Sequence, residues 1–104
     1  MAWIFLIAAG LLEIVWAFFM KQSDGFSKLG PSAITITAMI ASFGLLALAM
    51  RVLPLGTAYT IWTGLGAVGA FAVGIAVLGE PVSPLRLLAA SLIVGGLILM
   101  KLSS

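Results

Sequence analysis

Four long apolar runs dominate the chain, at about residues 3–20, 32–50, 57–78 and 85–101. A helix needs roughly 20 predominantly apolar residues to cross the hydrocarbon layer of a bilayer. Only helices and closed barrels satisfy their backbone hydrogen bonds there, and none of the runs shows the alternation of barrel strands. The pattern predicts an all-α membrane protein, with four transmembrane helices in one domain, residues 1–104.

The connectors between the runs carry residues typical of tight turns. "KQSDGFSKLGP" contains Asp-Gly and Gly-Pro, while "RVLPLG" and "GEPVSP" combine proline with glycine. Because all three connectors are short, we expect a tight up-down-up-down bundle. The first run lacks the positively charged start of a secretory signal, so we interpret it as a retained span.

Composition narrows the class of protein. Hydrophobic residues make up 63% and charged residues 8% of the chain, whereas soluble domains carry roughly 25% charged residues. Cysteine and histidine are absent, which excludes disulfides and the usual zinc, haem and Ser-His-Asp chemistry. The five basic residues are scattered, so nucleic-acid binding is not indicated. We expect no metal, no cofactor and no enzymatic activity.

The few charges also bear on orientation. If the helices alternate in direction, Lys21, Lys28 and Arg86 lie on one side of the membrane, and Arg51 and Lys101 lie on the other. Three against two is a weak positive-inside bias. The balance predicts insertion in both orientations; the alternative is that one helix alone fixes the orientation.

Glu13 is the only acidic residue inside a predicted span. A charged side chain at the bilayer centre costs roughly 2.5–3.5 kcal/mol on insertion scales, and such residues usually mark ion or proton pathways. Since desolvation disfavours the ionised carboxylate, Glu13 can hold a proton or a cation in alternation. This exclusivity predicts proton-driven cation export. The alternative is a protonated Glu13 that only hydrogen-bonds a neighbouring helix.

Aromatic residues accompany this carboxyl group. Trp16 follows Glu13 by three positions and shares its helical face, together with Gly10. Tyr59 and Trp62 are also three apart, near a helix end, where they fit either an interfacial belt or a site. Aromatic faces beside an anion suit a desolvated organic cation.

Two further residues of the apolar runs, Ser42 and Trp3, can be interpreted from their positions. Ser42 could orient the Glu13 carboxylate, but serines in membrane helices often bond a carbonyl of their own helix, and we expect that arrangement. Trp3 is expected in the interfacial belt.

Two facing copies of Glu13, in oppositely inserted chains, would form an inverted repeat of the kind that alternating access uses.

The glycine motif "GLGAVG" at residues 64–69 fits the G-x-G-x-x-G pattern but lies inside an apolar run, without the strand context of a dinucleotide site. We interpret it as a motif for helix packing and bending. Gly66 belongs to a face of small residues for close helix packing, and Gly64 with Gly66 makes a bendable point. Ser91 and Gly95 give a similar face, a candidate dimer contact.

Together these features resemble the small multidrug resistance family of bacterial transporters over essentially the whole chain. The resemblance rests on the four-span length, on "GLLEIVWA" around Glu13, on "KQSDGFSKLGPS" and on "LPLGTAYTIWTGLGAVG". Trp16, three residues after Glu13, resembles the pattern of the guanidinium-exporter branch. At this place the quaternary-ammonium exporters typically carry a small residue followed by threonine.

The resemblance implies an antiparallel, dual-topology homodimer of the bacterial inner membrane that exchanges protons for guanidinium ion. It further implies a role for each matching residue: Glu13 of both chains as the binding carboxylates; Gly10 and Trp16 shaping the site; Ser42 and Trp62 orienting the carboxylate; Tyr59 contacting the site and switching access; Gly64 and Gly66 as the flexible point; and the fourth helix, with Gly95, as the dimer contact. Lys101 also matches the branch.

Two alternatives remain beside the guanidinium exporter. The first is a broad exporter of quaternary ammonium cations, against which the bulk of Trp16 argues. The second is a non-transporting membrane partner subunit, in which Glu13 only joins helices. Guanidinium itself fits the chemistry, because its planar fork of N–H donors can pair bidentately with a carboxylate and stack on aromatic rings.

Overall fold

A computed structural model describes residues 1–103 of the chain. Within these residues it contains the four helices α1 (Ala2–Gln22), α2 (Leu29–Ala49), α3 (Leu55–Ala76) and α4 (Pro84–Leu102). Each helix overlaps one predicted span, and all four are long and apolar enough to cross a membrane. The prediction of an all-α protein with four membrane-spanning helices is confirmed.

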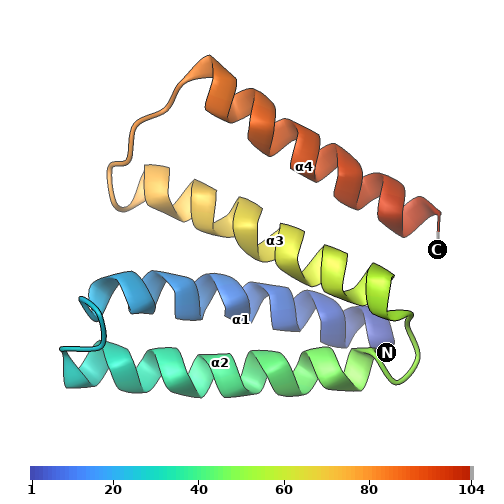
Figure 1. Cartoon of the computed structure of the whole chain (residues 1–104), viewed down its shortest axis with the longest axis horizontal. Coiled ribbons are helices and arrows are strands. Elements are labelled where there is room, and N and C mark those ends of the chain that lie inside the picture. Colours follow the sequence, from blue (N-terminus) through green and yellow to red (C-terminus); the bar gives the residue numbers. More distant parts are fainter. Residues whose placement is uncertain (104) are drawn as a thin grey trace.

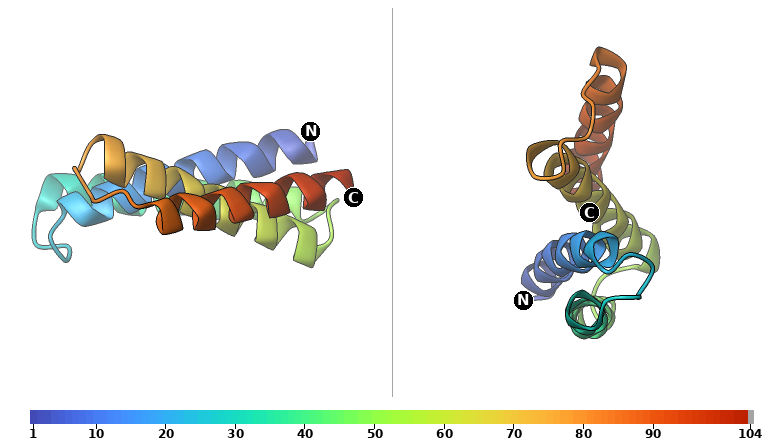
Figure 2. Two further views of the ribbon diagram at one scale, coloured as in Figure 1. Left: turned by 90° about the horizontal axis from the view of Figure 1, so that it is seen from above. Right: turned by 90° about the vertical axis from the view of Figure 1, so that its left-hand side faces the viewer.

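The four helices form a single layer and not a closed bundle. Figures 1 and 2 show them side by side in the order α2, α1, α3, α4, with the direction reversing along the chain. The overall extents are 40 × 35 × 16 Å, so the layer is about as thick as one to two helices. In the described residues α4 packs mainly against α3, and it meets α1 only near its C-terminal end. The expected tight bundle was therefore wrong.

The buried core lies at one end of this layer, where the first half of α1 meets the end of α2 and the start of α3. It is made of small and branched apolar residues with one indole: Leu6, Ala9, Leu46, Ala49, Ala58, Ile61 and Trp62. No described residue of α4 is buried. Short connectors make successive helices antiparallel but do not decide which helices pack together: α1 lies between α2 and α3 (Figure 1). They could not predict closure either, because an apolar face can meet lipid as well as a helix.

The helix ends follow the turn residues seen in the sequence. Pro84 opens α4, and the Ser83 hydroxyl caps it by accepting a hydrogen bond from the backbone N–H of Arg86 at 3.2 Å. Between α1 and α2, Asp24, Gly25 and Phe26 all have positive φ. These turns bring the 23–28 and 77–83 connectors to the same end of the layer (Figure 1).

Candidate functional site

Glu13 lies in the middle of α1, on the side that packs against α3. Its partly buried side chain rests against Gly66 of α3, and a Cβ added to Gly66 would overlap the Glu13 carboxyl group. One turn earlier on α1, a Cβ on Gly10 would overlap the side chain of Leu65. The two glycines therefore permit a helix contact that larger residues would prevent, and this contact positions the carboxyl group.

Two polar atoms beside this contact are buried without a hydrogen-bond partner among the described residues. They are Oε1 of Glu13 and Nε1 of Trp16, which stand one helical turn apart on α1. A buried polar group without a partner costs roughly 1–3 kcal/mol. A cation or a proton at the carboxyl group would satisfy Oε1 of Glu13, whereas the indole N–H of Trp16 needs an acceptor, which neither of them supplies.

Ser42 lies on α2 and is fully buried. Its hydroxyl donates a hydrogen bond to the carbonyl oxygen of Ala9 on α1 at 2.7 Å, and it accepts one from the indole N–H of Trp62 on α3 at 3.0 Å. The expectation that Ser42 bonds a carbonyl of its own helix was wrong. Thr35 and Thr37 on the same helix do bond in that way, but Ser42 faces a close neighbour with a free carbonyl lone pair.

These two hydrogen bonds join α3, α2 and α1 in one line. The carbonyl of Ala9 is the one that accepts the helical hydrogen bond of Glu13, four residues later. The network therefore holds the turn of α1 that carries Glu13. In this arrangement neither the Ser42 hydroxyl nor the Trp62 indole donates to the carboxylate itself.

We expect Ser42→Ala to destabilise the chain by about 1 kcal/mol, because it leaves the indole N–H of Trp62 without its buried acceptor. Unfolding of the purified protein by SDS in mixed micelles measures this change. The matched control is Thr37→Ala, whose hydroxyl makes an exposed bond to Ala33 at 2.8 Å. Equal midpoints for the two variants would contradict a structural role for the network.

An aromatic row runs across three helices next to Glu13. Phe43 of α2 packs edge-on against Trp16, with ring centroids 6.4 Å apart, and lies 5.6 Å from Trp62. Tyr59 extends the row, its ring 5.6 Å from Trp62. Trp62 is buried, whereas Tyr59 is 52% exposed. Tyr59 and Trp62 thus belong to one row with Phe43 and Trp16.

Sequence reasoning missed Phe43. The sequence pattern around a phenylalanine in an apolar run is the same whether the ring faces lipid, another helix or a binding site. Its position directly after Ser42 was the one available indication, since both residues lie at the middle of α2.

The remaining glycines differ in their surroundings. α3 is a continuous helix through Gly64 and Gly66, and a Cβ on Gly64 would come to 2.6 Å from Leu97 of α4. Gly64 thus permits the α3–α4 contact, and its role as a bendable point stays a prediction. Gly95 is exposed, with open space beyond its Cα, so its proposed dimer contact also stays a prediction.

The structure also bears on Lys101 and on metal binding. The ammonium group of Lys101 lies 4.3 Å from the ring centroid of Trp3 and so joins the end of α4 to the start of α1. In residues 1–103, no group of three or more histidine, cysteine, aspartate or glutamate residues could hold a metal ion.

Comparison with known proteins gives a family and close relatives. The family of the Small Multidrug Resistance protein matches residues 1–93. The chain is 61% identical to the guanidinium exporter of Salmonella typhimurium, and 59% identical to those of Escherichia coli K12 and Citrobacter freundii. Each alignment covers 104 residues, all of this chain and 99% of the relative.

Proposed function

This chain belongs to the small multidrug resistance family, and on that premise we propose that it is a proton-coupled antiporter that exports guanidinium ion. It is a transporter with four membrane-spanning helices, situated in the bacterial inner membrane. In the proposed cycle, Glu13 binds guanidinium on one side, releases it on the other, and returns carrying a proton.

The observation that carries this proposal is Oε1 of Glu13, which lies beside the aromatic row and has no hydrogen-bond partner within residues 1–103. A carboxylate in hydrocarbon that is not neutralised by a protein cation needs a proton or a ligand cation. Each neutralises the same charge, so the two exclude one another. That exclusion couples guanidinium export to proton entry without any further moving charge.

Guanidinium as the substrate is supported by the names of the relatives and by the shape of the site. Trp16 packs its indole one turn from the carboxyl group and against Phe43, so flat aromatic faces lie beside the anion. A planar cation with N–H donors can stack on such a face and pair with a carboxylate. A tetrahedral quaternary ammonium ion is bulkier and has no N–H donor.

We further propose that two chains inserted in opposite directions form the transporter. A layer 16 Å thick is too thin to enclose a pathway with access from both sides. Within the described residues, α4 buries no side chain, which leaves a face for the partner. Gly64 and Gly66 would bend α3 between the two access states, Tyr59 would help to switch access, and Gly95 would lie at the contact between copies.

Flux from proteoliposomes tests the proposed function. The purified chain is reconstituted, a pH gradient is imposed, and uptake of guanidinium and of tetraphenylphosphonium or a bulky quaternary ammonium ion is followed. We expect proton-driven guanidinium movement and much slower movement of the bulky cations. Equal flux of all cations would favour a broad exporter, and absence of proton-linked flux would favour a non-transporting subunit.

Dual insertion has a separate test, because the chain contains no cysteine. We expect Ser103→Cys, in intact cells, to react with a membrane-impermeant maleimide in about half of the chains, since three against two basic residues give little orientation bias. Complete labelling or none would show a single orientation.

A further inference from the structure

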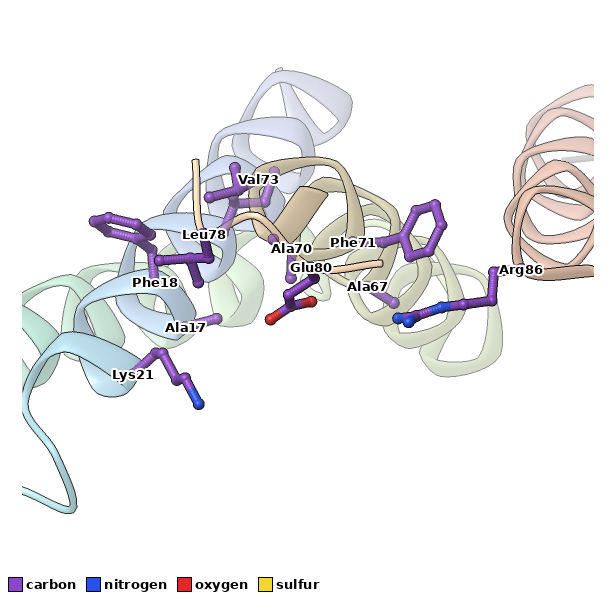
Figure 3. A pocket seen from close by; sticks show the side chains of 12 residues that line it. Ala17, Phe18, Lys21, Ala67, Ala70, Phe71, Val73, Leu78, Glu80 and Arg86 are labelled. Carbon is purple, nitrogen blue, oxygen red and sulfur yellow. The ribbon is translucent and has the colours of Figure 1, made fainter. Parts of the chain in front are cut away.

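A cavity of about 320 Å³ lies at the end of the layer where α1 ends and α4 begins. Three charged side chains line it: Lys21 from the last turn of α1, Glu80 from the α3–α4 connector, and Arg86 from the first turn of α4. Figure 3 shows Lys21 and Arg86 on opposite sides of Glu80, whose carboxylate points into the cavity. The described residues form no ion pair among these three groups.

The fold fixes the position of Glu80. Its backbone N–H donates to the carbonyl oxygen of Gly74 at 3.0 Å, and the preceding residue, Gly79, has a φ of 68°, a conformation that favours glycine. A Cβ on Gly74 would overlap the Glu80 carboxylate. The carboxylate therefore lies in a cradle formed by a glycine of α3, and it is not simply a mobile group on a loop.

Arg86 connects this cavity to an apolar groove. Its guanidinium lies 5.5 Å from the ring centroid of Phe71, and both residues also line a groove of about 250 Å³ between α3 and α4. Apart from Arg86, the groove is lined only by apolar residues, among them Ala90 and Ile93. Ile93 follows Arg86 by seven residues, so the groove runs about 10 Å along α4 into the hydrocarbon layer.

We propose that this cavity and groove bind one membrane aminophospholipid, such as phosphatidylethanolamine. The lipid phosphate pairs with Lys21 and Arg86, its primary ammonium pairs with Glu80, and an acyl chain lies in the α3–α4 groove. Basic pockets between membrane helices bind lipid head groups. The Glu80 carboxylate makes the site selective for an aminophospholipid over an anionic lipid. An anionic head group without an ammonium group would leave Glu80 unpaired, and the two negative charges would repel each other.

The site is separate from Glu13. Ile14 and Ala17 of α1 line the cavity, but the three charges lie at the ends of helices, at the level of the lipid head groups. Because the bound lipid would join α1, α3 and the loosely packed α4, it would act as a structural component at an end of the layer away from the main core.

Native mass spectrometry of the full chain, purified with equal amounts of phosphatidylethanolamine and phosphatidylglycerol, tests the proposal. We expect the wild type to retain phosphatidylethanolamine about fivefold more than phosphatidylglycerol, and Arg86→Gln to reduce phosphatidylethanolamine retention about fivefold. Glu80→Gln is the sharper variant: it should remove the preference without removing binding. The matched controls Lys28→Gln and Asp24→Asn are exposed charges of the same membrane end and should change neither lipid.

Several results would overturn the proposal. Equal retention of the two lipids by the wild type would do so, as would an unchanged preference in Glu80→Gln. If neither lipid is retained and Ala90→Cys forms disulfides between copies, a second chain covers the groove instead. The measurement needs no transport, so the lipid site and the proposed antiport can fail independently of one another.

Discussion

Replacing Glu13 with glutamine should abolish proton-driven guanidinium flux, reducing it to the level of empty liposomes. Glutamine keeps the size of the side chain but can neither release a proton nor carry a negative charge. Removing one partner of a buried charge pair costs roughly 2–5 kcal/mol, which predicts a loss of guanidinium affinity of about 30-fold or more. Flux assays and isothermal titration of the purified protein measure the two effects.

A folded but inactive protein is the expected state of this variant. Oε1 of Glu13 has no hydrogen-bond partner among the described residues, so the substitution breaks no hydrogen bond of that atom. Glu13→Gln should therefore unfold in SDS at the wild-type midpoint or above it, since a neutral amide is less costly in hydrocarbon. If flux persists in Glu13→Gln, the carboxyl group is not the exchange site.

Gly66→Ala is expected to weaken guanidinium binding by about 5- to 150-fold, corresponding to the roughly 1–3 kcal/mol that an extra methyl group costs in a tight contact. A Cβ at this position would overlap the Glu13 carboxyl group, so the carboxyl group has to move. Titration of the purified variant with guanidinium measures the affinity directly.

The control is Gly44→Ala on α2, where an added Cβ meets no atom within 4 Å. It should bind and transport guanidinium within about twofold of the wild type, because alanine suits a helix better than glycine. The pair also separates two roles of Gly66. Lost affinity supports positioning of Glu13, whereas normal affinity with slow exchange supports a flexible point in α3 and contradicts the positioning role.

The sequence was sufficient to predict the number and type of helices, because apolar length alone decides whether a helix can span a bilayer. It was not sufficient to predict how they pack. Leu92 and Ile93 of α4 are exposed and Leu6 of α1 is fully buried, yet all three have the same apolar character. Inside a membrane, hydrophobicity does not distinguish a helix-facing from a lipid-facing side chain.

The candidate site could be predicted only in part. Glu13 stood out, because a charge in hydrocarbon is rare and costly, and Trp16 followed from helical spacing. The partner of Ser42 could not be predicted, since Ala9 is 33 residues away and offers only a backbone carbonyl. Phe43 was missed because its ring is one apolar residue among many in α2.

Reciprocal exchange is the most direct test of the claim that one carboxyl group holds a proton or guanidinium in alternation. Proteoliposomes with a pH-sensitive dye inside are prepared at equal pH on both sides, and guanidinium is added outside. We predict that the interior becomes alkaline as guanidinium enters and protons leave, and that Glu13→Gln shows no change. No pH change in the wild type, or the same change in Glu13→Gln, would contradict the account.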